Sequence, residues 1–220
     1  NVSNDFTKTS SKGQIPFIEL NGRQTADSNF VIEHLKEEFQ KDPDANLTEA
    51  EKGQLTAYMA LLENNIFWAL VYNRSRSNAW LATDQGFAKH LSGLKLAFFK
   101  NFFLGQFKKR LANSVHVQGI GRHNQFEVEA IAKNAFDSLE QLLGERKFFF
   151  GPNPTTLDIT AFGHINQFLY APQASGELKK HLEEKCPNLV RMLKTLKEDL
   201  WPDWDEVIET LSLDTYEKQQ

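Results

Sequence analysis

The chain has 220 residues, of which 40% are hydrophobic, so it is long enough for one domain or two small ones with a sizeable core. Its net charge of −4 gives no general basis for nucleic-acid binding. The single cysteine, Cys186, excludes an internal disulfide and a cysteine-based zinc site, and it fits a reducing compartment. Because residues 1–12 are polar, we expect no signal peptide and a cytoplasmic location.

A strand, a turn, a second strand and a helix are predicted near the start of the chain. Residues 15–20 form a short apolar run that is typical of a strand. Asn21 and Gly22 both tolerate positive φ, which predicts a tight hairpin turn into a returning strand. Asp27 or Ser28 then caps a helix. The apolar positions of that helix are Phe30, Val31, Leu35 and Phe39.

Helical patterns follow the polar, proline-containing linker at residues 42–46. Thr48 and Glu51 are spaced as a capping box, and apolar residues then repeat at helical spacing. Since no second strand pattern appears, the sequence predicts an α+β, mostly α chain. We expect one domain at residues 1–42 and an all-helical domain at residues 48–213.

Large apolar residues crowd residues 86–111, but lysines interrupt the run too often for a membrane-spanning helix. Between Gln85 and Phe126 there are seven basic residues and no acid, whereas the stretch from Glu198 to Glu217 holds eight acids and no basic residue. Two interpretations are open. Either the two stretches attract each other within one fold, or residues 89–110 form a basic, aromatic face for an anionic ligand or a membrane surface.

The glycine-containing run at residues 119–123 lacks a preceding strand and the spacing of a phosphate-binding loop. It is better interpreted as a turn into the next helix, which ends near Gly144. Arg122 and His123 lie close to the start of that helix, where they could hold an anion.

A second capping box is predicted where Thr155 precedes an apolar helix and Asp158 follows three residues later. We expect this pair to hold the helix start and to do no chemistry. Cys186 has no histidine near it that would activate it, so we expect a structural thiol. The sequence therefore predicts no metal site.

The order Ile-Pro, hairpin, acid-Ser, helix resembles the second half of the thioredoxin-like domain of glutathione transferases. The resemblance implies that Pro16 is cis, that the backbone of Ile15 pairs with the cysteinyl part of glutathione, and that Asp27 and Ser28 hold its γ-glutamyl end. The residues alone favour the simpler interpretation, in which Asp27 or Ser28 is only a helix cap and Pro16 an ordinary trans proline at a strand start. The Thr-Asp pair at residues 155–158 is similar to the folding motif of the all-α domain of those transferases.

Further motifs narrow the resemblance to the failed-axon-connections family, which is close to the metaxins and to cadmium-responsive nematode proteins. They are the phenylalanine-rich insert, residues 119–123, residues 150–164 and the Trp-Pro-Asp-Trp string at residues 201–204. The resemblance implies the C-terminal half of a thioredoxin-like domain followed by the all-α domain. It also implies links to axon development and to the cadmium response.

The residues before Pro16 are too few for the strand, helix and strand with which a transferase domain begins. The transferase nucleophile, a Tyr, Ser or Cys at the end of that first strand, therefore has no counterpart, and we expect no catalytic residue. Two hypotheses follow. One is a non-catalytic adaptor for a protein or membrane partner, with a dimer as one alternative. The other is a glutathione-dependent transferase whose catalytic residue lies N-terminal to the chain.

Overall fold

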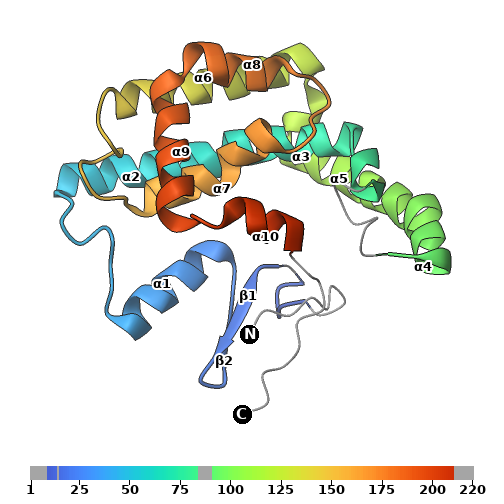
Figure 1. Ribbon diagram of the computed structural model, residues 1–220, viewed down its shortest axis with the longest axis horizontal. Helices are drawn as coiled ribbons and strands as arrows, with labels where there is room; N and C mark the ends of the chain where they lie inside the picture. Colours follow the sequence, from blue (N-terminus) through green and yellow to red (C-terminus); the bar gives the residue numbers. More distant parts are fainter. Residues whose placement is uncertain (1–8, 14, 84–90, 211–220) are drawn as a thin grey trace. The chain divides into compact units, whose positions relative to one another are not determined.

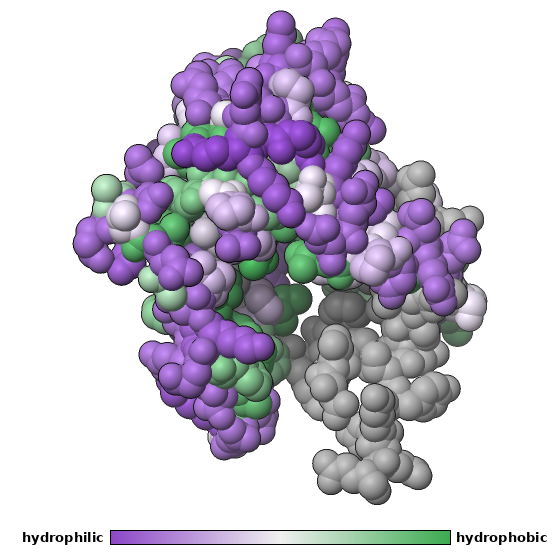
Figure 2. All heavy atoms as spheres, turned by 60° about the vertical axis from the view of Figure 1, so that its left-hand side comes forward, coloured by the Kyte–Doolittle hydropathy of each residue, from purple (hydrophilic) through white to green (hydrophobic). Residues whose placement is uncertain are grey.

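The computed structural model describes residues 9–13, 15–83 and 91–210 (Figure 1). The chain divides into two compact units, of which the second is Leu47–Glu209 and the first comprises the described residues before it together with Thr210. Each unit is described separately below. The face shown in Figure 2 is mostly hydrophilic, with hydrophobic side chains showing between the hydrophilic ones.

The first unit consists of a two-stranded antiparallel hairpin and one helix. Strand β1 (Phe17–Leu20) pairs with β2 (Arg23–Ala26), so that Phe17 lies opposite Ala26 and Leu20 opposite Arg23. Asn21 and Gly22 have φ values of 51° and 75°, which confirms the predicted turn of two positive-φ residues. Helix α1 (Ser28–Phe39) follows, with Asp27 as its N-cap.

Two of the four apolar positions of α1, Phe30 and Phe39, are exposed, and the other two, Val31 and Leu35, are half-buried. Phe30 is 61% exposed and Phe39 60% exposed, whereas His34 is the buried side chain of this helix. The His34 ring lies 2.7 Å from the Thr25 hydroxyl through Nδ1, which joins α1 to β2. Two strands of four residues each are too short to cover the whole apolar side of α1. The polar contact between His34 and Thr25 therefore takes the place of much of the apolar packing that the sequence pattern predicts.

The second unit is helical wherever the structure describes it. Its helices are α2 (Glu49–Leu61), α3 (Phe67–Arg76), α4 (Gly93–Phe98), α5 (Leu104–Gln118), α6 (Gln125–Leu143), α7 (Thr156–Tyr170), α8 (Glu177–Lys185), α9 (Pro187–Leu200) and α10 (Trp204–Thr210). Five-residue π-helical segments join α2 to α3 and α4 to α5, at Leu62–Ile66 and Phe99–Phe103. Between Thr48 and Thr210 the described residues form no sheet beyond an isolated bridge at Phe148 and Gly151, so the prediction of helices alone is confirmed for them.

The core of this unit lies among α3, α6, α7 and α9 (Figure 1), and α6 and α7 each contact both α3 and α9. Phe136 of α6 and Phe168 of α7 are fully buried and meet edge to face, with ring centroids 5.5 Å apart. Other fully buried side chains come from all four helices: Tyr72, Leu139, Ile165, Leu189 and Leu196. The mostly α, α+β class predicted from the sequence is therefore confirmed.

Gly121 allows the turn after α5 to pack directly against the end of that helix. A Cβ atom at Gly121 would lie 2.7 Å from the backbone nitrogen of His116 and 2.7 Å from the carbonyl carbon of Val115. No real Cβ makes such contacts with a backbone. We expect Gly121→Ala to lower the free energy of unfolding by about 1–3 kcal/mol, the usual range for overpacking. Urea unfolding followed by circular dichroism measures this.

Gly163, an exposed residue within α7, is the matched control for Gly121. A Cβ there meets nothing within 4 Å, so Gly163→Ala should stabilise the protein by about 0.5–1 kcal/mol through helix propensity. The two alanine variants should move the urea midpoint in opposite directions. A shift of the same sign in both would contradict the assigned contact.

Candidate functional site

The four residues that the transferase resemblance assigns to glutathione lie at one end of the hairpin. Pairing of Phe17 with Ala26 places Pro16 and Asp27, their chain neighbours, at the open ends of adjacent strands. The Ile15–Pro16 peptide bond is cis, as the resemblance implies. Ile15 is 63% exposed, and Pro16 and Ser28 are also exposed. This end of the hairpin is therefore open to solvent on the described part of the chain.

Asp27 has a structural role at this position. Its carboxylate accepts a hydrogen bond of 3.1 Å from the backbone N–H of Asn29, so it caps α1. Ser28 is the first residue of α1, where N–H groups without an intrahelical partner are available to an anion. The assignment of Ile15, Pro16, Asp27 and Ser28 to glutathione remains a prediction.

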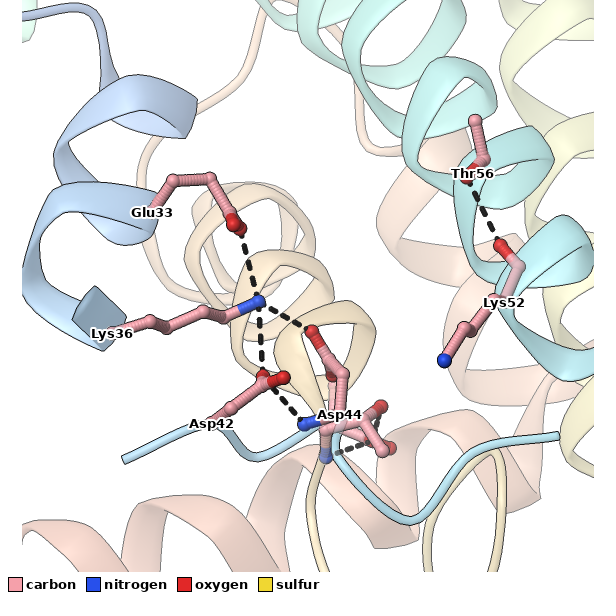
Figure 3. A network of polar contacts seen from close by, with 8 residues as sticks. Glu33, Lys36, Asp42, Asp44, Lys52 and Thr56 are labelled. Carbon is pink, nitrogen blue, oxygen red and sulfur yellow. Dashed lines mark hydrogen bonds and ion pairs between the residues drawn. The ribbon is translucent and has the colours of Figure 1, made fainter. Parts of the chain in front are cut away.

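A cluster of ionic contacts around Lys36 joins α1 to residues 42–46, which the sequence predicts to be a linker (Figure 3). Its ammonium group lies 2.7 Å from Asp44, 3.0 Å from Glu33 and 3.3 Å from Asp42. Burial lowers the pKa of Lys36, but these hydrogen bonds and the Asp44 charge outweigh burial and raise the pKa above its usual value. The linker is therefore held to the helix by ionic contacts. Sequence reasoning missed them because Asp42 and Asp44, unlike Glu33, lie outside the helix of Lys36.

We expect Lys36→Met to weaken the first unit by about 1–3 kcal/mol, since it removes charge-assisted hydrogen bonds from the nearly buried Asp44. Hydrogen exchange should show faster exchange over residues 28–46. The control is Lys52→Met, whose lysine is half exposed and contacts an exposed Glu49, so the exchange pattern should not change. Unchanged exchange in both variants would contradict the role given to Lys36.

Helices α4 and α5 and the π segment between them present what we call the aromatic–basic face. Leu94 is 89% exposed, Phe98 61%, Phe102 54% and Phe103 45%. A shallow groove on this face is lined by Leu91, Leu94, Lys95, Phe98, Phe99 and Phe103. The rings of Phe98 and Phe102 lie 5.1 Å apart, and those of Phe99 and Phe103 5.2 Å apart, so the aromatic side chains cover one another along the helix.

The charges on this face all have one sign. From Gly93 to Gln118 there are no acids, and the exposed cations are Lys95, Lys100, Lys108, Lys109 and Arg110. None of these five forms an ion pair with another described residue. In the acidic stretch that starts at Glu198, Asp199 pairs instead with Lys147 at 3.6 Å. The contacts of the described residues thus favour a basic face that is open to solvent over pairing between the basic and the acidic stretch. Residues 84–90 and 211–220 are not among the described residues.

Arg122 and His123 are both exposed, as an anion site requires, but an acid lies beside them. Glu127 accepts a 2.8 Å hydrogen bond from the N–H of Asn124 and lies 3.4 Å from Nδ1 of His123. The start of α6 therefore carries a negative charge of its own. The anion site at Arg122 and His123 remains a prediction, and these contacts disfavour it.

Thr155 and Asp158 form a capping box at the start of α7. Asp158 is fully buried, and its carboxylate accepts hydrogen bonds from the backbone N–H of Phe149 at 2.9 Å and of Thr155 at 2.8 Å. The Thr155 hydroxyl donates a third, at 2.7 Å. Burial raises the pKa of Asp158, although these hydrogen bonds act in the opposite direction. The Asp158 carboxylate therefore joins the loop at Phe149 to the start of α7.

The prediction that Cys186 has no histidine near it is wrong. Asp137 of α6 accepts a hydrogen bond from the Cys186 thiol at 3.7 Å and lies 2.7 Å from Nε2 of His181 in α8. Burial, aided by the charges of Asp137 and Glu140, raises the pKa of Cys186 to about 12, so the thiol is not an activated nucleophile. His181 is five residues before Cys186 and could have been noticed in the sequence, whereas Asp137 is 49 residues away.

Comparison with known proteins identifies relatives of this chain. Models of the glutathione S-transferase N-terminal and C-terminal domains match residues 1–80 and 132–196. Failed axon connections of Drosophila melanogaster is 34% identical over 98% of this chain and 53% of its own length. The chain belongs to a glutathione-S-transferase-like family related to failed axon connections and the metaxins. This confirms the resemblance found from the motifs.

The chain is also similar to metaxins and to a glutathione transferase. A metaxin-1 homologue of Caenorhabditis briggsae is 30% identical over 96% of this chain and 64% of its own length. An isoprene-epoxide–glutathione S-transferase of Rhodococcus sp. is 26% identical over 84% of the chain and 77% of its own length. The chain thus spans between half and two thirds of the first relatives that it matches. No solved structure matches it significantly.

Proposed function

We propose that this relative of failed axon connections is a non-catalytic interaction protein that docks on an anionic membrane surface through its aromatic–basic face. The observation that carries the proposal is that exposed phenylalanines share one helical segment, Gly93–Gln118, with exposed cations that form no ion pair with any residue the structure describes. The name of the Drosophila relative suggests axon development as the setting.

The physical basis is the sum of two weak attractions. Transfer of an exposed phenylalanine out of water contributes about 1.5–3 kcal/mol, and each lysine near an anionic membrane contributes about 1 kcal/mol. Two exposed rings and several lysines together suffice for reversible surface binding. No described helix is long and apolar enough to cross a bilayer, so the proposed contact is peripheral.

Sedimentation with lipid vesicles tests the proposal. The purified chain is mixed with vesicles of phosphatidylcholine alone or of phosphatidylcholine with phosphatidylserine, at low and at high salt. We expect binding to the anionic vesicles at low salt, weaker binding at high salt, and little binding to neutral vesicles. Absence of binding to anionic vesicles at low salt, or equal binding to both compositions, would contradict the proposal.

A second candidate is a glutathione-dependent transferase, which the similarity to the Rhodococcus enzyme supports. In this alternative the helix start at Ser28 receives the γ-glutamyl carboxylate and Asp27 its ammonium group. Calorimetry with glutathione and a conjugation assay with a standard electrophile separate the candidates. For the interaction protein we expect weak or undetectable glutathione binding and no conjugation. Conjugation that Ser28→Ala abolishes would make the transferase the better assignment.

A further inference from the structure

Three side chains with metal-ligating atoms meet where α6 packs against α8 and the start of α9. They are Asp137 from α6, His181 from α8 and Cys186 from the junction between α8 and α9. One ligand atom of each lies within 4.8 Å of the others. A carboxylate oxygen, an imidazole nitrogen and a thiolate sulfur are all ligands that Zn²⁺ accepts.

The present distances are close to those of a coordination sphere. Zinc–ligand bonds of about 2.0–2.3 Å in tetrahedral geometry place neighbouring ligand atoms about 3.3–3.8 Å apart. The thiol sulfur and the Asp137 oxygen are already 3.7 Å apart, and the His181 nitrogen and the same oxygen are 2.7 Å apart. The His181 nitrogen and the Cys186 sulfur lie within 4.8 Å of each other, so side-chain rotations would have to bring these two atoms, together with the half-exposed Asp137, into one coordination sphere.

The helices hold two of these groups firmly. Cys186 ends α8 through its N–H bond to the carbonyl of Leu182 at 3.1 Å, and its own carbonyl accepts the N–H of Val190 in α9 at 3.0 Å. His181 lies on α8 and its side chain is 16% exposed, whereas that of Asp137 is 42% exposed. An ion would therefore enter from the Asp137 side, and water could take the fourth position. Ligands on packed helices are positioned more rigidly than ligands on loops.

The charge around the thiol is negative. Asp137 and Glu140 both act on Cys186 through their charges. Glu140 accepts hydrogen bonds from the N–H groups of Asn188 at 3.1 Å and Leu189 at 2.7 Å, so it occupies the positive end of α9 that would otherwise face the sulfur. A divalent cation would compensate the negative charge of these carboxylates and would take the place of the thiol proton.

We propose that Asp137, His181 and Cys186 form a binding site for Zn²⁺ or another divalent ion of similar ligand preference. Binding forms bonds from the metal to the Asp137 oxygen, the neutral His181 Nε2 and the Cys186 sulfur. The thiol loses its proton to solvent, and one water completes four coordination. The site would join α6, α8 and α9 through one ion.

Cobalt titration of the tag-free, chelator-treated chain tests this site, because Co²⁺ takes zinc positions and reports a bound thiolate. We expect saturation at one equivalent, visible bands of tetrahedral cobalt, a thiolate charge-transfer band in the near ultraviolet, and loss of all bands when Zn²⁺ is added. Zn²⁺ should also raise the melting temperature. Cobalt that keeps the spectrum of the aqueous ion would overturn the proposal.

Matched variants identify the ligands. Cys186→Ser, Asp137→Asn and His181→Gln each keep side-chain size and a hydrogen-bonding atom, and circular dichroism of the metal-free chains checks that they fold. Each should lose the zinc-dependent rise in melting temperature, and Cys186→Ser should lose the charge-transfer band. His164→Gln, on α7, should bind cobalt as the parent does. Parent-like binding in Cys186→Ser, or equal loss in His164→Gln, would overturn the assignment.

Discussion

Asp158→Ala will lower the free energy of unfolding by about 3 kcal/mol or more. The substitution removes a fully buried carboxylate that accepts three hydrogen bonds from Phe149 and Thr155. The two backbone N–H groups would remain buried without an acceptor, and each such group costs about 1–3 kcal/mol. Thr155→Ala removes the hydroxyl of the same cap and should cost about 0.5–2 kcal/mol.

Glu51→Ala is the control for Asp158→Ala because it removes the acid of the exposed capping box at Thr48. Water can replace that carboxylate, so its loss should be clearly smaller. Chemical unfolding of the three variants, with glutathione calorimetry on each folded protein, distinguishes a structural role from a binding role. Parent-like stability of Asp158→Ala would mean that the buried contacts are wrongly assigned. Lost glutathione affinity at unchanged stability would mean that the pair serves a ligand.

Joint replacement of Phe98 and Phe102 by serine will weaken binding to anionic vesicles at least about tenfold. Both rings are more than half exposed, so the substitution removes apolar surface from the aromatic–basic face without opening a cavity. Because only about half of each ring is exposed, the two rings together contribute about 1.5–3 kcal/mol on entering the interface, and 1.4 kcal/mol already corresponds to a factor of ten. Vesicle sedimentation at fixed lipid composition and salt gives the ratio.

Phe126→Ser is the control for this effect because Phe126 is 81% exposed but lies at the start of α6, outside the aromatic–basic face. Its affinity for the vesicles should match that of the parent. Lys100→Glu with Lys108→Glu should also weaken binding, with the largest loss at low salt, since these substitutions reverse two charges. Equal losses for Phe126→Ser and for the double serine variant would show that any exposed ring suffices, and the assigned face would be wrong.

Local features of this protein could be predicted from the sequence because neighbouring residues produce them. The turn at Asn21 and Gly22 depends on residues that adopt positive φ, and the box at Thr48 and Glu51 on side chains three residues apart. The helical class of the second unit follows from apolar spacing in the same way, and the aromatic–basic character of Gly93–Gln118 from composition. The motifs that indicate the family are of this kind too.

Tertiary structure alone decided which of these residues meet. Asp137 reaches His181 and Cys186 across 44 and 49 residues, because α6 packs against α8 and α9. Packing also determines that Phe98 and Phe102 are exposed. In the same way, Phe30 and Phe39 are not buried, although their helix is amphipathic. Periodicity indicates which face of a helix is apolar. Whether that face is covered depends on elements that are distant in the chain. For this reason the proposed membrane face could be anticipated from the sequence, whereas the proposed metal site became visible only in the folded chain.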